Sequence, residues 1–323
     1  MAAFLARRLI QGFVVVVLVA TIVFFLIHAA PGDPFSSAMD NPAVTDSVRA
    51  AWRHAYGLDR PLAEQYVRYL ASVFRGELGL STSRRPVADA IADALPNTLL
   101  LMTVGLAAGF GLGILTAIAQ ARRVGTRADR ILGGISLAFY SLPDFWFAQL
   151  MLVTFALWLN IFPTGGSIEV TSYDLLSPAG KFSDRLEHLI LPALTLALLY
   201  FPIIARHQRA ALLDTLPAEF VVTARAKGVS ESSVVRRHAL RNALLPVVTL
   251  LGVAFPALFT GAVFVEKVFS WPGMGTLIVN AISGRDYLLL TSAVIFSSAF
   301  VVMGSIAADV LYRMLDPRLR SDH

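Results

Sequence analysis

Six long apolar runs, separated by polar segments, set the pattern of this chain. They occupy residues 9–28, 97–119, 131–159, 188–205, 243–265 and 287–312. Each run is long enough for a helix to cross the roughly 30 Å of hydrocarbon in a bilayer. The pattern therefore predicts six transmembrane helices.

Proline and glycine interrupt these runs. Pro143 lies inside the third and longest run. Its missing N–H and its ring break or kink a helix, so we expect that span to be tilted or broken there. Gly109, Gly111 and Gly113 lie in the second run. Small residues at such positions permit close packing between membrane helices.

The segment between the first two runs, residues 29–95, is too long for a simple turn. Apolar residues recur at helical spacing in 45–57, 61–76 and 84–95, and the middle stretch begins with proline and ends with glycine. The segment therefore predicts amphipathic helices on the outer side of the membrane. They would either dock an external partner or cap the helical bundle.

A basic, polar stretch interrupts the apolar pattern at residues 206–243. It predicts two short helices separated by Gly228. Pro217, at the expected first helical position, and Glu219 suit the start of the first helix. Ser230 suits the cap of the second. Such a charged pair of helices is typical of a docking element for a soluble partner, and an ordinary basic loop is the alternative.

Arginine and lysine predict the orientation of the spans. With the N-terminus inside, the inner segments carry 16 basic residues in 68 positions, and the outer segments carry 11 in 116. Cationic loops stay on the cytoplasmic side. Both termini and the 206–243 stretch are therefore expected in the cytoplasm.

Composition supports a membrane protein by a separate route. The chain is 56% hydrophobic and 15% charged, with a mean hydropathy of +0.66; soluble domains carry about a quarter charged residues. Cysteine is absent, which excludes disulfides and thiolate metal sites. The net charge of +5 comes from the cytoplasmic loops and indicates contact with anionic lipid rather than nucleic acid.

Catalytic and metal-binding motifs are missing from the sequence. Lys181, Lys227 and Lys267 precede Phe, Gly and Val, so the chain lacks the Gly-Lys-Ser/Thr of a phosphate-binding loop. The histidines are scattered without metal-ligand spacing. We therefore expect a chain that is not an enzyme.

Two carboxylates lie inside the predicted spans. Asp144 follows the helix-breaking proline of the third run, and it should face protein or water because its desolvation is costly. Broken helices often line transporter sites, so Asp144, Phe145 and Trp146 are candidates for a translocation path. A structural hydrogen bond is the alternative for Asp144. Asp309, in the last run, is expected to form a structural pair near the inner face.

An outer turn follows the fifth run. Glu266 opens this segment, which contains Trp271, Pro272 and Gly273. The turn is a candidate outer gate. A purely packing role is the alternative.

The ordered motifs resemble the permease subunits of ABC importers, specifically the dipeptide, oligopeptide and nickel branch. The stretch TARAKGVSESSVVRRHALRNALLPVV is similar to the "EAA" loop of that branch. Further similar stretches are RRLIQGFVVVVLVATIVFFLIHAAPGDP, YGLDRPLAEQYVRYL, GELGLS, HLILPALTLAL, VFSWPGMG and VLYRMLDPRLR. The chain departs from the broader pattern at Val222, where the glutamate of "EAA" falls, and at Leu240–Arg241, where a Leu-Pro falls.

This resemblance implies an all-α integral membrane protein with the type I ABC importer permease fold. Its six transmembrane helices carry an extracytoplasmic helical insert after the first helix. The expected division is 1–28 for the first helix, 29–95 for the insert, 96–316 for the permease core and 317–323 for a cytoplasmic tail. The 206–243 stretch becomes the loop that couples the core to an ATPase.

The resemblance also implies a complex in a bacterial cytoplasmic membrane. Its members are a homologous second permease, two ATPase subunits and an extracytoplasmic substrate-binding protein. ATP and magnesium belong to the ATPase subunits, and this chain is expected to bind no cofactor. The residues assigned to ATPase coupling are Glu219, Ala224, Arg225, Ala226, Lys227, Gly228, Ser230, Arg237 and His238.

Dipeptides or oligopeptides are the expected cargo. The alternatives within the same machinery are a nickel chelate, glutathione or haem. An ion-coupled carrier would need several paired intramembrane charges, and the sequence has few. A membrane-embedded enzyme is the other reading from a different class.

Overall fold

The computed structural model describes residues 2–29, 59–260 and 262–315. Within these ranges the regular structure is helical, apart from one antiparallel bridge between Leu80 and Pro86. The longer helices are α1 (Ala2–Ala29), α4 (Leu62–Arg75), α5 (Val87–Ala121), α6 (Arg127–Tyr140), α7 (Asp144–Met151), α8 (Pro178–Thr215), α9 (Glu219–Ala226), α12 (Leu245–Ala254), α15 (Met274–Ser283) and α16 (Tyr287–Leu315). The helix expected at 45–57 and the tail at 317–323 lie outside the described residues.

Shorter elements connect these helices. They are a π-helix η1 (Leu152–Trp158), a 3-10 helix η2 (Tyr173–Leu175), α10 (Glu231–Ser233), a second π-helix η3 (Val234–Ala239), α11 (Leu240–Ala243), α13 (Ala257–Thr260) and α14 (Val263–Val268). The predicted fifth span is therefore built from several consecutive helical pieces rather than one.

Five stretches are long and apolar enough to cross a membrane: α1, α5, α8, Leu245–Val268 and α16. A sixth results if α6 and the α7–η1 helix form one span, and these two are bent by 104° relative to each other. Pro143 caps the N-terminus of α7, so the predicted break at this proline is confirmed. Backbone that leaves the helical ladder at membrane depth must contact protein or water rather than lipid.

α5 and α8 pack closely along their length. Gly105, Gly109 and Gly113 recur at four-residue spacing on the side of α5 that meets α8. A Cβ at Gly105 would lie 2.7 Å from the Cβ of Leu196, and one at Gly113 would lie 2.6 Å from the Cβ of Ile204. Glycine is therefore what allows the two backbones to approach this closely.

The first turns of α5 replace a separate helix that the sequence predicts at 84–95. They continue without interruption into the membrane span. Val87 and Ile91 are buried there against residues of α15 and α16. The expected division between insert and core at 95/96 thus falls inside one continuous helix.

α4 packs along α1 on the flank of the bundle. It begins after Pro61 and ends at Gly76, whose φ is +72°, as the sequence predicts for this stretch. The hydroxyls of Thr21 and Tyr66 are 2.7 Å apart, and Phe13 and Phe74 stack with their ring centroids 5.6 Å apart.

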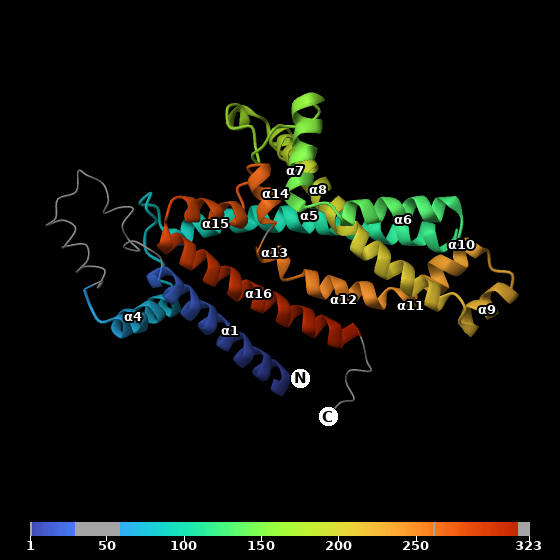
Figure 1. Ribbon diagram of the computed structural model, residues 1–323, viewed down its shortest axis with the longest axis horizontal. Helices are drawn as coiled ribbons and strands as arrows, with labels where there is room; N and C mark the ends of the chain where they lie inside the picture. The colour runs from blue at the N-terminus through green and yellow to red at the C-terminus, as the bar shows by residue number, and fades with distance from the viewer. Residues whose placement is uncertain (1, 30–58, 261, 316–323) are drawn as a thin grey trace.

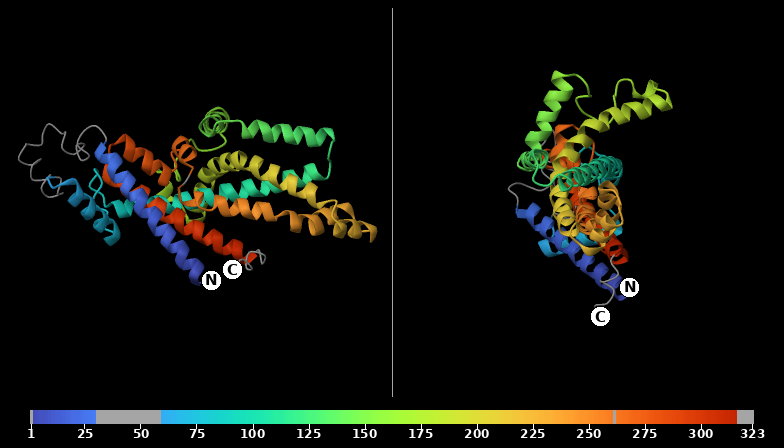
Figure 2. Two further views of the ribbon diagram at one scale, coloured as in Figure 1. Left: turned by 60° about the horizontal axis from the view of Figure 1, so that its bottom comes forward. Right: turned by 90° about the vertical axis from the view of Figure 1, so that its right-hand side faces the viewer.

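The long helices lie side by side along the longest axis of the molecule (Figure 1). α4 and α15 lie near one end, and α9 and α10 lie at the other, while α7 stands across this direction. Seen from the end that carries α9, α7 and the first turns of α8 extend from the bundle on one side (Figure 2).

Candidate functional site

The loop between α8 and α12 folds onto the ends of α5 and α8. An apolar cluster joins them, made of Ala117, Ala121, Leu212, Val221, Ala224, Val234, Val235, Ala239 and Ala243. Val221 of α9 and Val234 of η3 are fully buried in it, and each such side chain stabilises the contact by roughly 1.5–3 kcal/mol. The cluster therefore joins α9 and η3 directly to the ends of α5 and α8.

Gly228 forms the turn between the two short helices, as predicted. Its φ is +77°, a left-handed conformation that favours glycine. Its N–H donates to the carbonyl of Arg225 at 2.9 Å, and the N–H of Val229 donates to that of Ala224 at 3.3 Å. Ser230 occupies the next N-cap, but its hydroxyl donates to the Oγ of Ser233 at 3.2 Å instead of capping the backbone.

The first helix of the loop starts later than the sequence predicts. Pro217 lies in the turn before α9, which begins at Glu219 after an N-cap at Ala218. Glu219 lies in the first turn of α9, where a carboxylate complements the helix dipole.

Arg225 and Glu231 close the turn from its two sides. The guanidinium donates from Nε to Oε2 at 3.0 Å and from Nη2 to Oε1 at 2.8 Å, and Nη1 donates to the carbonyl of Leu216 at 3.3 Å. The hydrogen bonds and the charge of Arg225 hold the pKa of Glu231 below its ordinary value. This two-pronged pair fixes α9 relative to the second helix.

The outward face of the loop combines apolar and cationic side chains. Phe220 and Val222 of α9 are 44% and 52% exposed. Arg236, Arg237, His238 and Arg241 are exposed as well, and they line a shallow groove with Leu240 and Leu244. Such a face suits a partner that offers an apolar recess and carboxylates.

The residues assigned to coupling divide into an inner and an outer set. Ala224 is buried in the apolar cluster. The others lie on the accessible face of the loop: Glu219, Arg225, Ala226, Lys227, Gly228, Ser230, Arg237 and His238. They share one compact loop, so the structure brings the whole predicted set together.

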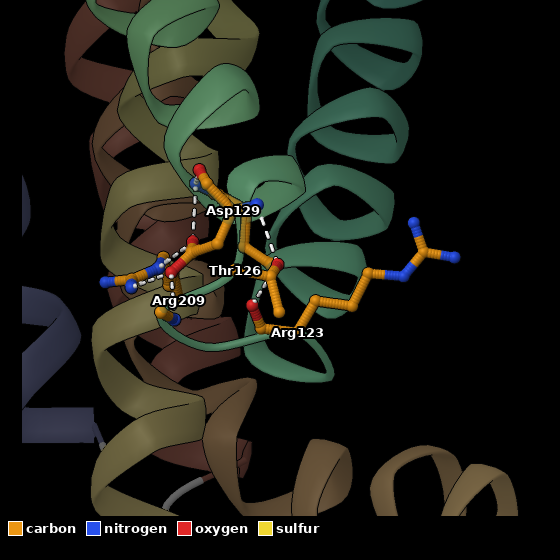
Figure 3. A network of polar contacts seen from close by, with 6 residues as sticks. Arg123, Thr126, Asp129 and Arg209 are labelled. Atoms are coloured by element: carbon orange, nitrogen blue, oxygen red, sulfur yellow. Dashed lines mark hydrogen bonds and ion pairs between the residues drawn. The ribbon is translucent and has the colours of Figure 1, made fainter.

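A buried polar network beside this loop was missed by the sequence analysis (Figure 3). The carboxylate of Asp129 accepts from Nε and Nη2 of Arg209 at 3.2 and 2.9 Å. It also accepts from the N–H of Gly125 at 3.1 Å and from Nε2 of Gln120 at 3.3 Å. Thr126 caps the same helix by accepting from the N–H of Asp129 at 3.3 Å. The network ties α5, α6 and α8 together.

The three candidate path residues lie at the start of α7. Asp144 is in the first turn of this helix and is exposed, as are Phe145 and Trp146. The ring of Phe145 lies 6.1 Å from that of Phe264 in α14. The carboxylate therefore projects from the broken backbone of the third span instead of being enclosed by this chain.

The outer turn is tied to α5 by a buried carboxylate. Glu266 is fully buried, and its Oε1 accepts from the hydroxyl of Thr98 at 2.8 Å. Its Oε2 accepts from the N–H groups of Gly275 and Thr276 at 2.7 and 3.2 Å, which caps α15. A Cβ at Gly273 would lie 2.5 Å from both Glu266 Oε2 and Thr98 Oγ1.

Trp271 packs behind the outer turn that Glu266 and Thr98 hold against α5. Its side chain is only 1% exposed, and Nε1 donates to the carbonyl of Asn97 at 3.0 Å. Pro272 is exposed, and its carbonyl accepts from Asn97 Nδ2 at 3.1 Å. Of the three candidate gate residues, Trp271 and Gly273 therefore pack tightly against α5, whereas the side chain of Pro272 stays accessible.

Other polar groups have structural partners. Asp309 pairs with Arg8 at 3.0 Å, which joins α16 to α1, as expected for a structural pair. Among the described residues, no three His, Asp or Glu side chains come together as a metal site.

Comparison with known families gives a match over nearly the entire chain. Residues 93–321 match the family described as the inner membrane component of binding-protein-dependent transport systems. Residues 1–102 match the N-terminal region of such membrane components.

Curated relatives cover the chain from end to end. The oligopeptide transport system permease protein AppB of Bacillus subtilis (strain 168) is 36% identical over 99% of both chains. The di/tripeptide transport system permease protein DppB of Pseudomonas aeruginosa (strain UCBPP-PA14) is also 36% identical over 99% of both. The glutathione transport system permease protein GsiC of Escherichia coli (strain K12) is 35% identical over 99% of both.

A solved structure shares the fold. A chain of the MetNI methionine ABC transporter in an inward facing conformation superposes with a TM-score of 0.55 at 18% identity. The match covers 72% of this chain and 98% of that one. The helical arrangement is thus that of an ABC importer permease.

Proposed function

The chain belongs to the family of inner membrane components of binding-protein-dependent transport systems, and from this premise we propose that it carries peptides. It is a permease subunit of an ABC importer and an all-α, multi-pass membrane protein. The names of its relatives favour dipeptides or oligopeptides, and the glutathione relatives keep a small modified peptide within the same class.

The observation that carries the mechanism is the rigid loop between α8 and α12. In the proposed complex it docks an ATPase subunit, which binds ATP and magnesium and hydrolyses the ATP. Phe220 and Val222 would enter an apolar recess, and the exposed arginines would meet carboxylates. Closure of the ATPases would then move α5 and α8 through the buried cluster and open the path alternately to the two sides.

The proposed path passes the start of α7. There the helical backbone is broken, and the carboxylate of Asp144 is free to meet the ammonium end of a peptide. Phe145 and Trp146 would supply the apolar wall of the path. A second, homologous permease would provide the other half, and an extracytoplasmic binding protein would deliver the cargo.

The proposed orientation puts both termini and the docking loop in the cytoplasm of a bacterial cell. A reporter fused after Arg241 should behave as cytoplasmic, and one fused near Asp59 as external. Opposite behaviour at both positions would overturn the coupling role of the loop.

The function is tested by reconstituting the chain with the products of neighbouring transport genes. Peptide loaded on the binding protein should stimulate ATP hydrolysis and enter proteoliposomes. Stimulation by glutathione alone, a nickel chelate alone or haem alone would reassign the cargo while keeping the machinery. A chain that moves cargo without any ATPase would contradict the proposal.

A further inference from the structure

A cavity of about 780 Å³ lies between α6 and α8, next to the network in Figure 3. Arg130 of α6 and Arg206 and His207 of α8 line it, and all three residues are exposed. Neither arginine forms an ion pair with another described residue, whereas Arg209 is neutralised by Asp129. The cavity thus carries two uncompensated positive charges.

Gln120 and the paired Asp129 and Arg209 of the network also line the cavity, together with Ser136, and the rest of the lining is largely apolar. In α6, Leu137 and Tyr140 lie two to three helical turns after Arg130. In α8, Pro202 and Ile203 lie about one turn before Arg206 and His207. The cationic end of the cavity therefore lies nearer the 206–243 loop, and the apolar end lies nearer the membrane interior.

We propose that this cavity binds one anionic phospholipid. The phosphate lies against Arg130 and Arg206, and an acyl chain runs along Leu137 and Ile203. Guanidinium groups match the geometry of phosphate oxygens, and basic pockets between membrane helices on the cytoplasmic side hold anionic headgroups. The volume is within the roughly 300–1,000 Å³ of small-molecule sites.

The order of the lining is what favours a lipid over a soluble anion. A free phosphate would use the cations alone and leave the apolar half of the cavity wet. In the orientation proposed above, a phospholipid of the cytoplasmic leaflet has its phosphate toward the cytoplasm and its acyl chains toward the membrane interior. The cationic and apolar ends of the cavity lie in the same order. Bound there, it bridges α6 and α8 beside the Asp129–Arg209 pair.

The test is a titration of the purified complex in neutral detergent, with bound lipid counted by native mass spectrometry. One arm uses a phosphatidylglycerol, a second uses a phosphatidylcholine with the same chains, and a third uses inorganic phosphate. The double variant R130Q/R206Q should bind phosphatidylglycerol about 25-fold more weakly, since each cation contributes about fivefold. The control R123Q/R127Q removes the same charge from exposed positions outside the cavity and should bind normally.

A second variant separates the shape of the cavity from its charge. Leu137→Trp fills the apolar end and should exclude the lipid while both arginines remain. Equal binding of the two lipids, an equal loss in the control, or retention of phosphate in place of lipid would overturn the proposal. Normal phosphatidylglycerol binding by R130Q/R206Q together with lost peptide uptake would also overturn it, because it assigns the cavity to the translocation path.

The lipid count is independent of the transport assay. If the preparation lacks ATPase subunits but keeps its preference for phosphatidylglycerol, the proposed function fails and the lipid site stands. If the ATPases are retained and the preference is absent, the lipid site fails alone.

Discussion

Arg225 donates two hydrogen bonds to the carboxylate of Glu231 across the turn at Gly228, from Nε to Oε2 at 3.0 Å and from Nη2 to Oε1 at 2.8 Å. Both side chains are partly exposed, at 40% and 56%, so the pair stabilises the loop by about 0.2–1 kcal/mol. Its larger effect is geometric, because it sets the angle between α9 and the second helix.

Arg225→Gln should therefore leave membrane insertion unchanged and weaken retention of the ATPase subunits during purification. The exchanged pair R225E/E231R should recover part of the loss. Arg123→Gln, which removes an exposed cation from the segment between α5 and α6 and lies outside the residues assigned to coupling, is the matched control. Equal effects of Arg225→Gln and Arg123→Gln would show that only the positive charge of this surface matters.

The same pair predicts a pH dependence. Arg225 lowers the pKa of Glu231 in the folded loop below its ordinary value of 4.5. The ionised pair therefore stabilises the loop at any pH above 4.5, and this stabilisation is lost as the pH falls through the lowered pKa of the folded loop. Hydrogen exchange of the loop amides, corrected for intrinsic rates, should rise below about pH 4.5 in the wild type. In Glu231→Gln the profile should be flat, and a flat wild-type profile contradicts the assignment.

Gly228 tests the turn by conformation alone. A Cβ placed there meets nothing within 4 Å, so any penalty comes from its positive φ. Gly228→Ala should destabilise the loop by about 1–2 kcal/mol and reduce ATPase-coupled transport. Gly228→Asn, which tolerates this conformation better, should behave closer to wild type. Gly228→Asp should insert normally and lose ATPase association and transport, because it adds an unwanted charge to the turn.

Gly113 and Gly111 form a matched pair in α5. A Cβ at Gly113 would lie 2.6 Å from Ile204 Cβ and 2.9 Å from the carbonyl oxygen of Phe201, whereas one at Gly111 meets nothing within 4 Å. Gly113→Ala should lower stability by about 1–3 kcal/mol. Gly111→Ala should be neutral or stabilise by up to about 1 kcal/mol, because alanine favours the helix. Thermal unfolding of the two purified variants decides; equal melting temperatures would refute the packing argument.

Asp144→Asn tests the path. If the carboxylate meets the ammonium end of the cargo, uptake of peptides with a free amino terminus should fall by an amount equivalent to about 1–3 kcal/mol, with the melting temperature unchanged. Asp309→Asn breaks a structural pair with Arg8 and should lower the melting temperature without altering cargo preference. Unchanged uptake by Asp144→Asn would remove this residue from the path.

Local patterns in the sequence were sufficient for several elements. The apolar runs, the break at Pro143 and the turn at Gly228 each depend on residues that are consecutive in the sequence, so they could be predicted. The start of α5 could not. Its first turns bury Val87 and Ile91 against α15 and α16, which are distant in the sequence. In the sequence, residues 84–95 resemble a separate amphipathic helix, but this packing makes most of them the first turns of the membrane span.

The polar network around Asp129 could not be predicted either, because its partners are far apart in the sequence. Asp129 and Arg209 are 80 residues apart. From the sequence alone, an acidic residue near the start of a helix is explained equally well by a local interaction with the helix dipole. Glu266 and Thr98 are 168 residues apart, so the sequence left the outer turn open between gating and packing. Only the tertiary arrangement reveals that these groups are partners.

The length of α8 has a mechanical consequence. Its 38 residues run from Pro178 to Thr215, about 57 Å at 1.5 Å per residue. A rod of this length that pivots at its centre by about 10° moves each end by about 5 Å in opposite directions. In the proposed transport cycle, a small pull at the α9 end would thereby become a swing of the Pro178 end of α8, by leverage rather than by a relay of side chains.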